Sequence, residues 1–171
     1  MKMRFEFPQD RPAASPQRGA APVGQLHELP AVDLAAIIYL RAWCDGESAR
    51  QIIAEDFRLV MGERAGKAAA GDFDALMSSF LRNARRPVMR HGMGCKCFGG
   101  DESVFASLIA SAAARDRDDA ALFASTLINA SAVYGIVYLA EQVGQAFLHL
   151  ARSASKVQAP THVSPALPYK H

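Results

Sequence analysis

The sequence predicts an all-α protein: a compact bundle of about five helices with an irregular N-terminal arm and an irregular C-terminal tail. Half of the 171 residues are hydrophobic, which is enough for one domain with a core. Apolar residues between positions 31 and 153 recur every three or four positions, the period of an α-helix. Eight of the nine prolines lie within residues 8–30 or 160–168, where they exclude regular helix.

The first 30 residues form the predicted arm. Their prolines alternate with Ala, Gly, Gln and Arg, a composition that buries too little apolar surface to offset the entropy lost on ordering. We therefore expect residues 1–30 to be mostly flexible. Met3, Phe5 and Phe7 alternate with charged residues, so a short strand or a docked segment is the alternative at the start of the arm.

Two helices are expected after the arm. The first runs from Ala31 to about Cys44, with Arg41 on the same stripe as its apolar residues, and Asp45-Gly46 can end it. Ser48 can cap the second helix. Its apolar stripe consists of Ile52, Ile53, Phe57, Val60 and Met61. Recurring glycines predict a break in the mid-sixties.

Three further helices complete the predicted bundle. The third begins near Asp72 and ends at Arg85-Arg86, because Pro87 disfavours helical geometry in the residue before it. A loop over residues 87–100 follows, and Asp101 is placed to cap the fourth helix. Asp118 or Asp119 can start a fifth helix that runs to about Arg152.

The uncharged run from Ala120 to Ala140 has nearly the length needed to span a membrane. Its Ser, Thr and Asn side chains would need partners inside lipid, and acidic rather than basic residues flank it. We therefore interpret the run as a buried helix of the bundle.

The predicted tail covers residues 154–171. Pro160, Pro165 and Pro168 exclude regular helix there, and Val163, Leu167 and Tyr169 remain as side chains that could dock. The predicted organisation is therefore an arm over residues 1–30, a helical bundle domain over 31–153 and a tail over 154–171.

The charge balance excludes a strong general attraction to polyanions. Nineteen basic and seventeen acidic residues give a net charge of +2, so neither nucleic acid nor a membrane is expected as a partner. The densest positive charge runs from Arg82 to Lys96. Arg82, Arg85 and Arg86 are explained as cations that complement a helix dipole, and no aromatic side chains interleave with them as stacking platforms.

The cysteines indicate a reducing compartment. Their number is three, and two of them are separated by one residue, which is a poor fit to a secreted disulfide framework. The first residues contain no apolar run long enough for the core of a signal peptide. We therefore expect a cytoplasmic protein.

Reactive side chains concentrate in the loop over residues 87–100, which we call the Cys/His loop. It carries His91, Cys95 and Cys97 among four glycines, and a glycine-rich backbone bends easily toward one centre. Zn²⁺ prefers four nitrogen or sulfur ligands, and Cys44 could complete a Cys₃His set. Asp101 and His27 are lesser candidates for the fourth ligand. Zinc is thus the one cofactor the sequence suggests.

Two alternatives use the same atoms. Lys96 and the start of the following helix could stabilise a thiolate, which would make Cys95 or Cys97 a redox-active thiol. The other alternative is an inert loop with buried cysteines and a hydrogen-bonded histidine. A phosphate site fits less well, because the glycines match neither GxGxxG nor GxxxxGK[ST].

The sequence predicts no catalytic residues, since it has no GxSxG motif and its carboxylate pairs lie on polar helix faces. The leading hypothesis is a small helical binding protein that interacts with a protein partner or forms a homo-oligomer and uses the Cys/His loop as a structural zinc site. The competing hypotheses are a thiol-based redox protein and a helical scaffold with neither activity.

Overall fold

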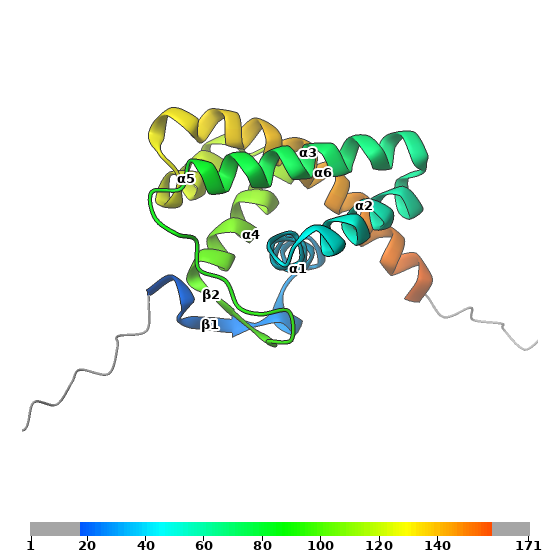
Figure 1. The fold of residues 1–171 in the computed structure, drawn as a ribbon, viewed down its shortest axis with the longest axis horizontal. Helices are drawn as coiled ribbons and strands as arrows, with labels where there is room; N and C mark the ends of the chain where they lie inside the picture. The colour runs from blue at the N-terminus through cyan, green and yellow to red at the C-terminus, as the bar shows by residue number, and fades with distance from the viewer. Residues whose placement is uncertain (1–17, 159–171) are drawn as a thin grey trace, which may run out of the picture.

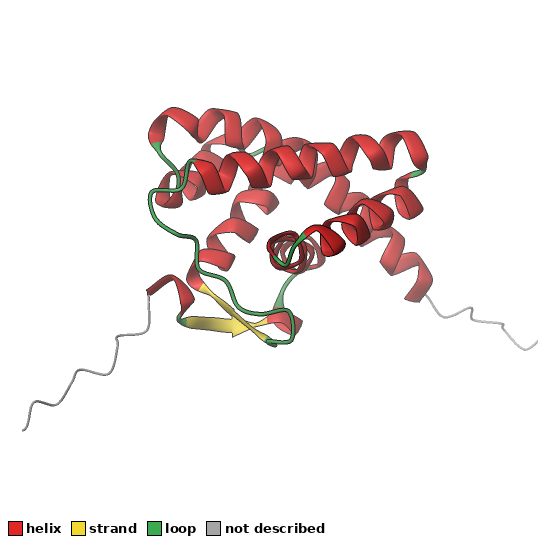
Figure 2. Ribbon diagram, viewed as in Figure 1, coloured by secondary structure: helices red, strands yellow, loops and turns green. Residues whose placement is uncertain are grey.

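A computed structural model describes residues 18–158 and confirms the all-α class (Figures 1 and 2). Within this part of the chain, six α-helices pack into a compact bundle, with a two-stranded sheet at one end. The helices are α1 (Ala31–Cys44), α2 (Glu47–Met61), α3 (Glu63–Arg82), α4 (Gly100–Ala113), α5 (Arg117–Leu127) and α6 (Val133–Gln158). The strands are β1 (Pro22–Gln25) and β2 (Cys97–Gly99), and the short 3₁₀ turns are η1 (Arg18–Ala20), η2 (Leu26–Glu28) and η3 (Ala130–Ala132).

The predicted fifth helix is in fact two helices. The chain leaves α5 at Ile128, which is extended and forms an antiparallel bridge with Ala84. The Asn129 amide donates to the Asn83 carbonyl over 3.0 Å. Pairing with the segment after α3 therefore replaces the helical hydrogen bond that Asn129 would otherwise make. Apolar periodicity alone does not reveal such a long-range bridge. No helix among residues 18–158 is long and apolar enough to cross a membrane.

The break predicted in the mid-sixties lies at Gly62. Its φ of 82° is a left-handed conformation that glycine adopts without strain, and the chain reverses there between α2 and α3. Helix α3 therefore starts at Glu63, earlier than the predicted start near Asp72, and it ends at Arg82 rather than at Arg86. The Asn83 amide makes the last hydrogen bond to this helix, on the Ser79 carbonyl.

Residues 18–30 of the predicted arm form regular structure. Strand β1 pairs antiparallel with β2, matching Gln25 with Cys97 and Pro22 with Gly99, and the Leu26 amide continues the pairing on the Lys96 carbonyl over 2.8 Å. The partner strand is only three residues long, too short for an alternating pattern to predict it. The expectations for Met3, Phe5 and Phe7 lie outside the described residues.

The other end of the chain also continues further than expected. Helix α6 runs to Gln158, beyond the boundary predicted at residue 153. The possible docking side chains of the tail, Val163, Leu167 and Tyr169, lie outside the described residues.

The core lies where α1, α2, α3 and α6 meet. Four aromatic rings form its centre, with neighbouring centroids 5.2–6.3 Å apart: Tyr39, Phe57, Phe73 and Phe147. Such tilted and stacked pairs stabilise a core beyond the area that they bury. A second pair, Phe80 and Phe105, joins α3 to α4. This core fixes α1 and α4, the two helices that hold the Cys/His loop.

Candidate functional site

The Cys/His loop connects α3 to α4 and runs beside α1, whose Arg41 donates to the Cys95 carbonyl (Figure 1). Two consecutive acidic residues in the first turn of α4 fasten it. Asp101 accepts hydrogen bonds from both terminal nitrogens of Arg86, over 2.7 and 2.8 Å, and from the Met89 amide over 2.9 Å. Asp101 therefore holds the first part of the loop. Burial raises the pKa of this carboxyl, but the bonds from Arg86 and Met89 lower it more, so that its net pKa lies below the usual value.

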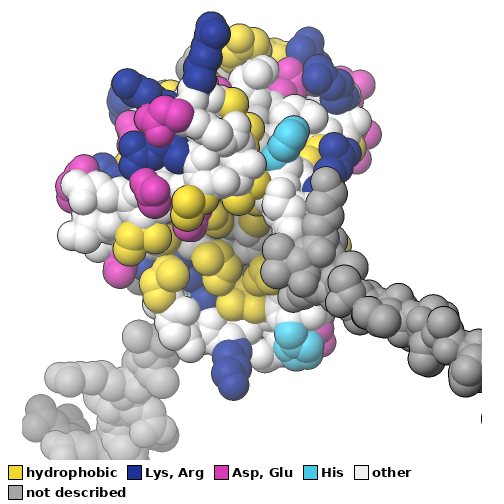
Figure 3. All heavy atoms as spheres, turned by 90° about the vertical axis from the view of Figure 1, so that its right-hand side faces the viewer, with side chains coloured by type: hydrophobic (Ala, Val, Ile, Leu, Met, Phe, Trp, Pro, Cys, Tyr) yellow, Lys and Arg dark blue, Asp and Glu magenta, His cyan; other side chains and the backbone are white. Residues whose placement is uncertain are grey.

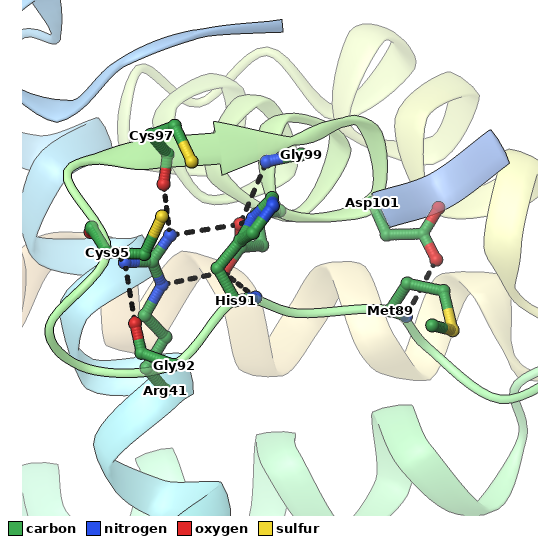
Figure 4. Close-up of polar contacts among 9 residues, drawn as sticks. Arg41, Met89, His91, Gly92, Cys95, Cys97, Gly99 and Asp101 are labelled. Carbon is green, nitrogen blue, oxygen red and sulfur yellow. Dashed lines mark hydrogen bonds and ion pairs between the residues drawn. The ribbon is translucent and has the colours of Figure 1, made fainter. Parts of the chain in front are cut away.

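Glu102 holds the middle and the end of the loop. Its carboxylate is fully buried and accepts five hydrogen bonds, two from Arg41, two from His91 and one from the Gly99 amide (Figure 4). Burial raises the pKa of this carboxyl, but the bonds from Arg41, His91 and the two amides outweigh that effect and lower the pKa to about 2. Glu102 is therefore ionised at neutral pH.

Arg41 shapes the loop from below. Its guanidinium is fully buried, with Nε 2.7 Å from Glu102 Oε1 and Nη2 3.1 Å from Oε2. The remaining N–H groups donate to three loop carbonyls, those of Gly92 (3.3 Å), Cys95 (2.8 Å) and Cys97 (2.7 Å). The planar fork of an arginine suits such a set of acceptors, and lysine would lack it. Arg41 therefore positions the backbone of both loop cysteines.

The hydrogen bond to Glu102 also decides the tautomer of His91. Nδ1 lies 2.8 Å from Glu102 Oε2, and an ionised carboxylate only accepts, so Nδ1 carries the proton. In the neutral ring, Nε2 then presents its lone pair to another group. His91 is thus oriented and prepared as a ligand by a buried carboxylate.

One ring nitrogen of His91 and the sulfur atoms of Cys95 and Cys97 all lie within 4.8 Å of one another. Figure 4 shows the two sulfur atoms beside the imidazole ring and above Arg41. In a tetrahedral zinc site, bond lengths of about 2.0–2.3 Å place ligand atoms about 3.5–3.8 Å apart. The three donors would therefore have to move about 1 Å closer together to bind a metal.

The two loop thiols differ in acidity. The Cys97 thiol donates a hydrogen bond that favours the Cys95 thiolate, which lowers the pKa of Cys95. The same bond favours the protonated form of Cys97, which raises its pKa. Cys95 is consequently the thiol that ionises first, and its thiolate is the first to react with a metal ion or an oxidant.

The other candidate ligands do not join this group. Cys44 packs against the hydrophobic core at the end of α1, and burial raises the pKa of its thiol. The carboxylate of Asp101 is bound to Arg86 and Met89, and it lies at the first turn of α4 rather than at the cap, which is Gly99. His27 is exposed in η2. The structure therefore assembles three of the four predicted ligands.

The cationic residues before the loop are mostly engaged. Arg86 pairs with Asp101, and Arg85 donates to the carbonyls of Ile128 (3.0 Å) and Ser125. Both side chains therefore bind other parts of this chain. Since α3 already ends at Arg82, its dipole explains the presence of these cations only in part.

The sequence interpretation missed Arg41 and Glu102 as residues of the site. A signal was present for Arg41, because it falls on the apolar stripe of its helix, and a charge there needs a buried partner. For Glu102 the sequence offers no such signal, because it lies beside Asp101 at the start of a helix, where acidic residues are common. Comparison of the chain with protein-family models, curated proteins and solved structures finds no match.

Proposed function

We propose that this chain is a small helical binding protein whose Cys/His loop holds a transition-metal ion through His91, Cys95 and Cys97. The observation that carries the proposal is the convergence of these donors within 4.8 Å, together with the bond from His91 Nδ1 to the buried Glu102 carboxylate. Metal-binding histidines almost always donate their second ring N–H to such a partner, which orients the ring and raises its basicity.

Zn²⁺ is the ion that these donors fit best. Thiolate and imidazole ligands suit its borderline-soft character, and two thiolates neutralise its charge. Glu102 is not counted as a ligand, because its negative charge is already balanced by Arg41, whose Nε lies 2.7 Å from Glu102 Oε1. Binding would release the protons of both thiols, so the affinity for Zn²⁺ would rise with pH.

Three protein ligands leave one position of a tetrahedral ion to water or to a group from another molecule. The loop is exposed at Gly92, Met93, Gly94 and Lys96, so a second protein could reach that position. This connects the metal to the proposed interaction with a protein partner or a second copy. A reducing compartment such as the cytoplasm would keep the thiols available, and we place the protein there.

Metal titration of the purified full-length protein tests the proposal. Co²⁺, as a spectroscopic probe, should bind once per chain with thiolate charge-transfer absorption, and Zn²⁺ should displace it. Cys95→Ser and Cys97→Ser should weaken binding at least 100-fold, whereas Cys44→Ser, the matched control outside the group, should leave it unchanged. Glu102→Gln should weaken binding about 10- to 100-fold through the orientation of His91. Equal binding by all variants, or none by the wild type, would refute the metal site.

A second candidate is reversible thiol oxidation, which the lowered pKa of Cys95 favours. Hydrogen peroxide would oxidise Cys95 to a sulfenic acid with release of one water. The Cys97 thiol would then attack the sulfur of this sulfenic acid, which forms the Cys95–Cys97 disulfide and releases a second water molecule. Rapid labelling of Cys95 in metal-free protein, with no stoichiometric metal bound, would favour this candidate over the metal site.

A further inference from the structure

A second feature of the fold, independent of the metal site, is an apolar groove along α2. One hollow of about 300 Å³ lies between α1 and α2 and reaches Met93 of the loop. Another, of about 380 Å³, lies between α2 and the end of α6. Tyr39 and Asp56 line both hollows, so the two hollows adjoin along α2, and we call them together the α2 groove. Figure 3 views the side on which α2 and the end of α6 lie, and it shows hydrophobic side chains gathered near the middle of this side.

Helix α2 carries two apolar stripes. Ile53 and Phe57 face the core and are buried. Ile52, Leu59 and Val60 face the groove, and Ile52 and Leu59 remain 64% and 75% exposed. Single exposed apolar residues are ordinary, whereas these residues line two adjoining hollows, which is an arrangement expected of a docking surface.

We propose that residues 159–171 of the same chain bind in the α2 groove. Helix α6 ends at Gln158, and its Leu150, Ser153 and Ala154 line the second hollow. The described chain therefore ends about one helical turn beyond one end of the groove. The segment has thirteen residues, which span about 40 Å when extended, whereas the fifteen residues of α2 are about 22 Å long. The segment is long enough to run along the whole of α2.

The composition of the segment fits the groove. Pro160, Pro165 and Pro168 favour an extended polyproline conformation, which loses little entropy on binding and docks in grooves lined by aromatic side chains. Val163, Leu167 and Tyr169 provide apolar side chains for the two hollows. Tyr39, half-buried at the junction of the hollows, is the aromatic residue they would meet.

The charges are complementary as well. Asp45 and Asp56 line the groove, and Tyr39 donates its hydroxyl proton to Asp56 over 3.0 Å. The segment contains Lys170 and no acidic residue. An exposed ion pair contributes only about 0–1 kcal/mol. The apolar side chains would therefore supply most of the binding free energy, and the charges would set the direction in which the segment runs along the groove.

A labelled peptide of residues 159–171, added to full-length proteins, tests the proposal. In the wild type the chain's own segment should compete with it, whereas a full-length Val163→Ser, Leu167→Ser, Tyr169→Ser variant should leave the groove open. A tethered segment acts at an effective concentration on the order of 1 mM. For an intrinsic peptide Kd of about 100 μM, the apparent Kd should then be about tenfold lower for the variant than for the wild type.

Groove variants complete the test. In the background of the serine variant, Ile52→Glu should abolish peptide binding. Leu122→Glu on α5 is the matched control, because Leu122 is 63% exposed, like Ile52, but does not line the groove. This variant should still bind the peptide. Circular dichroism verifies that each variant is folded. Failure of the peptide to bind the serine variant, or equal binding by both glutamate variants, would overturn the proposal. A wild-type dimer that Ile52→Glu dissociates would overturn it too, because a second copy would then occupy the groove.

Discussion

Arg41 is a charged residue on the hydrophobic side of α1. Removing a guanidinium from water costs several kcal/mol, which the ion pair with Glu102 and the three loop carbonyls offset. These contacts specify one loop conformation, because each bond requires a particular carbonyl to face the helix. The buried pair therefore acts mainly by placing Cys95 and Cys97.

Breaking this pair should strongly destabilise the protein. Glu102→Gln keeps the shape of the side chain but leaves Arg41 buried without a counter-charge, and we expect a loss of about 3–5 kcal/mol in the free energy of unfolding. Urea unfolding followed by circular dichroism measures it. Glu55→Gln is the matched control, since its pair with Arg58 is exposed and should contribute less than about 1 kcal/mol. Similar losses in the two variants would contradict the role of the buried pair.

The same carboxylate predicts acid sensitivity. Its pKa is about 2 in the folded protein against a usual value of 4.5, so its stabilising contribution is complete above about pH 4.5 and is lost as the pH falls toward 2. The difference corresponds to about 3 kcal/mol. Urea midpoints between pH 7 and pH 3, with a chelator present, should fall steeply for the wild type and less for Glu102→Gln. Parallel pH profiles would show that Glu102 is not the responsible group.

Among the elements, the helices could be predicted and several of their ends could not. Apolar spacing located α1 and α2 because it is a local property of the sequence. The end of α5 depends on a bridge between Ile128 and Ala84, which are 44 positions apart, and the early start of α3 depends on contact with α2. The same distinction holds for the candidate site. Its proposed ligands are close together in the sequence and could be predicted from it. The pairing of Arg41 with Glu102 could not, because the two residues are 61 positions apart.

Helix α3 offers a test of that contact. A Cβ at Gly66 would lie 2.5 Å from Arg58 Cα, within the backbone of α2, so Gly66→Ala forces the two helices apart. We expect it to cost about 1–3 kcal/mol of unfolding free energy. Gly71→Ala in the same helix meets nothing within 4 Å and should stabilise the protein by about 0.5–1 kcal/mol. Thermal and urea unfolding would separate the two, and a stabilised Gly66→Ala variant would mean that α2 and α3 are further apart than described.

At the scale of the whole molecule, the Cys/His loop joins parts that are far apart in sequence. Strand β2 contains Cys97 and pairs with β1, while Arg41 on α1 and Glu102 on α4 hold the same loop. A ligand that fixes the loop should therefore stabilise both the helical bundle and the segment around β1.

Zinc should accordingly raise the thermal stability of the full-length protein. With free Zn²⁺ at about 1,000 times its Kd, mass action stabilises the folded state by about 4 kcal/mol, or about 10 °C for a chain of this size. Exchange of the Leu26 amide, bonded to the Lys96 carbonyl, should slow at the same time. Differential scanning fluorimetry and hydrogen exchange measure the two effects, with Cys44→Ser responding like the wild type. If the Cys95→Ser, Cys97→Ser double variant gains the same stability from zinc, the ion binds elsewhere, because that variant lacks both sulfur donors of the loop.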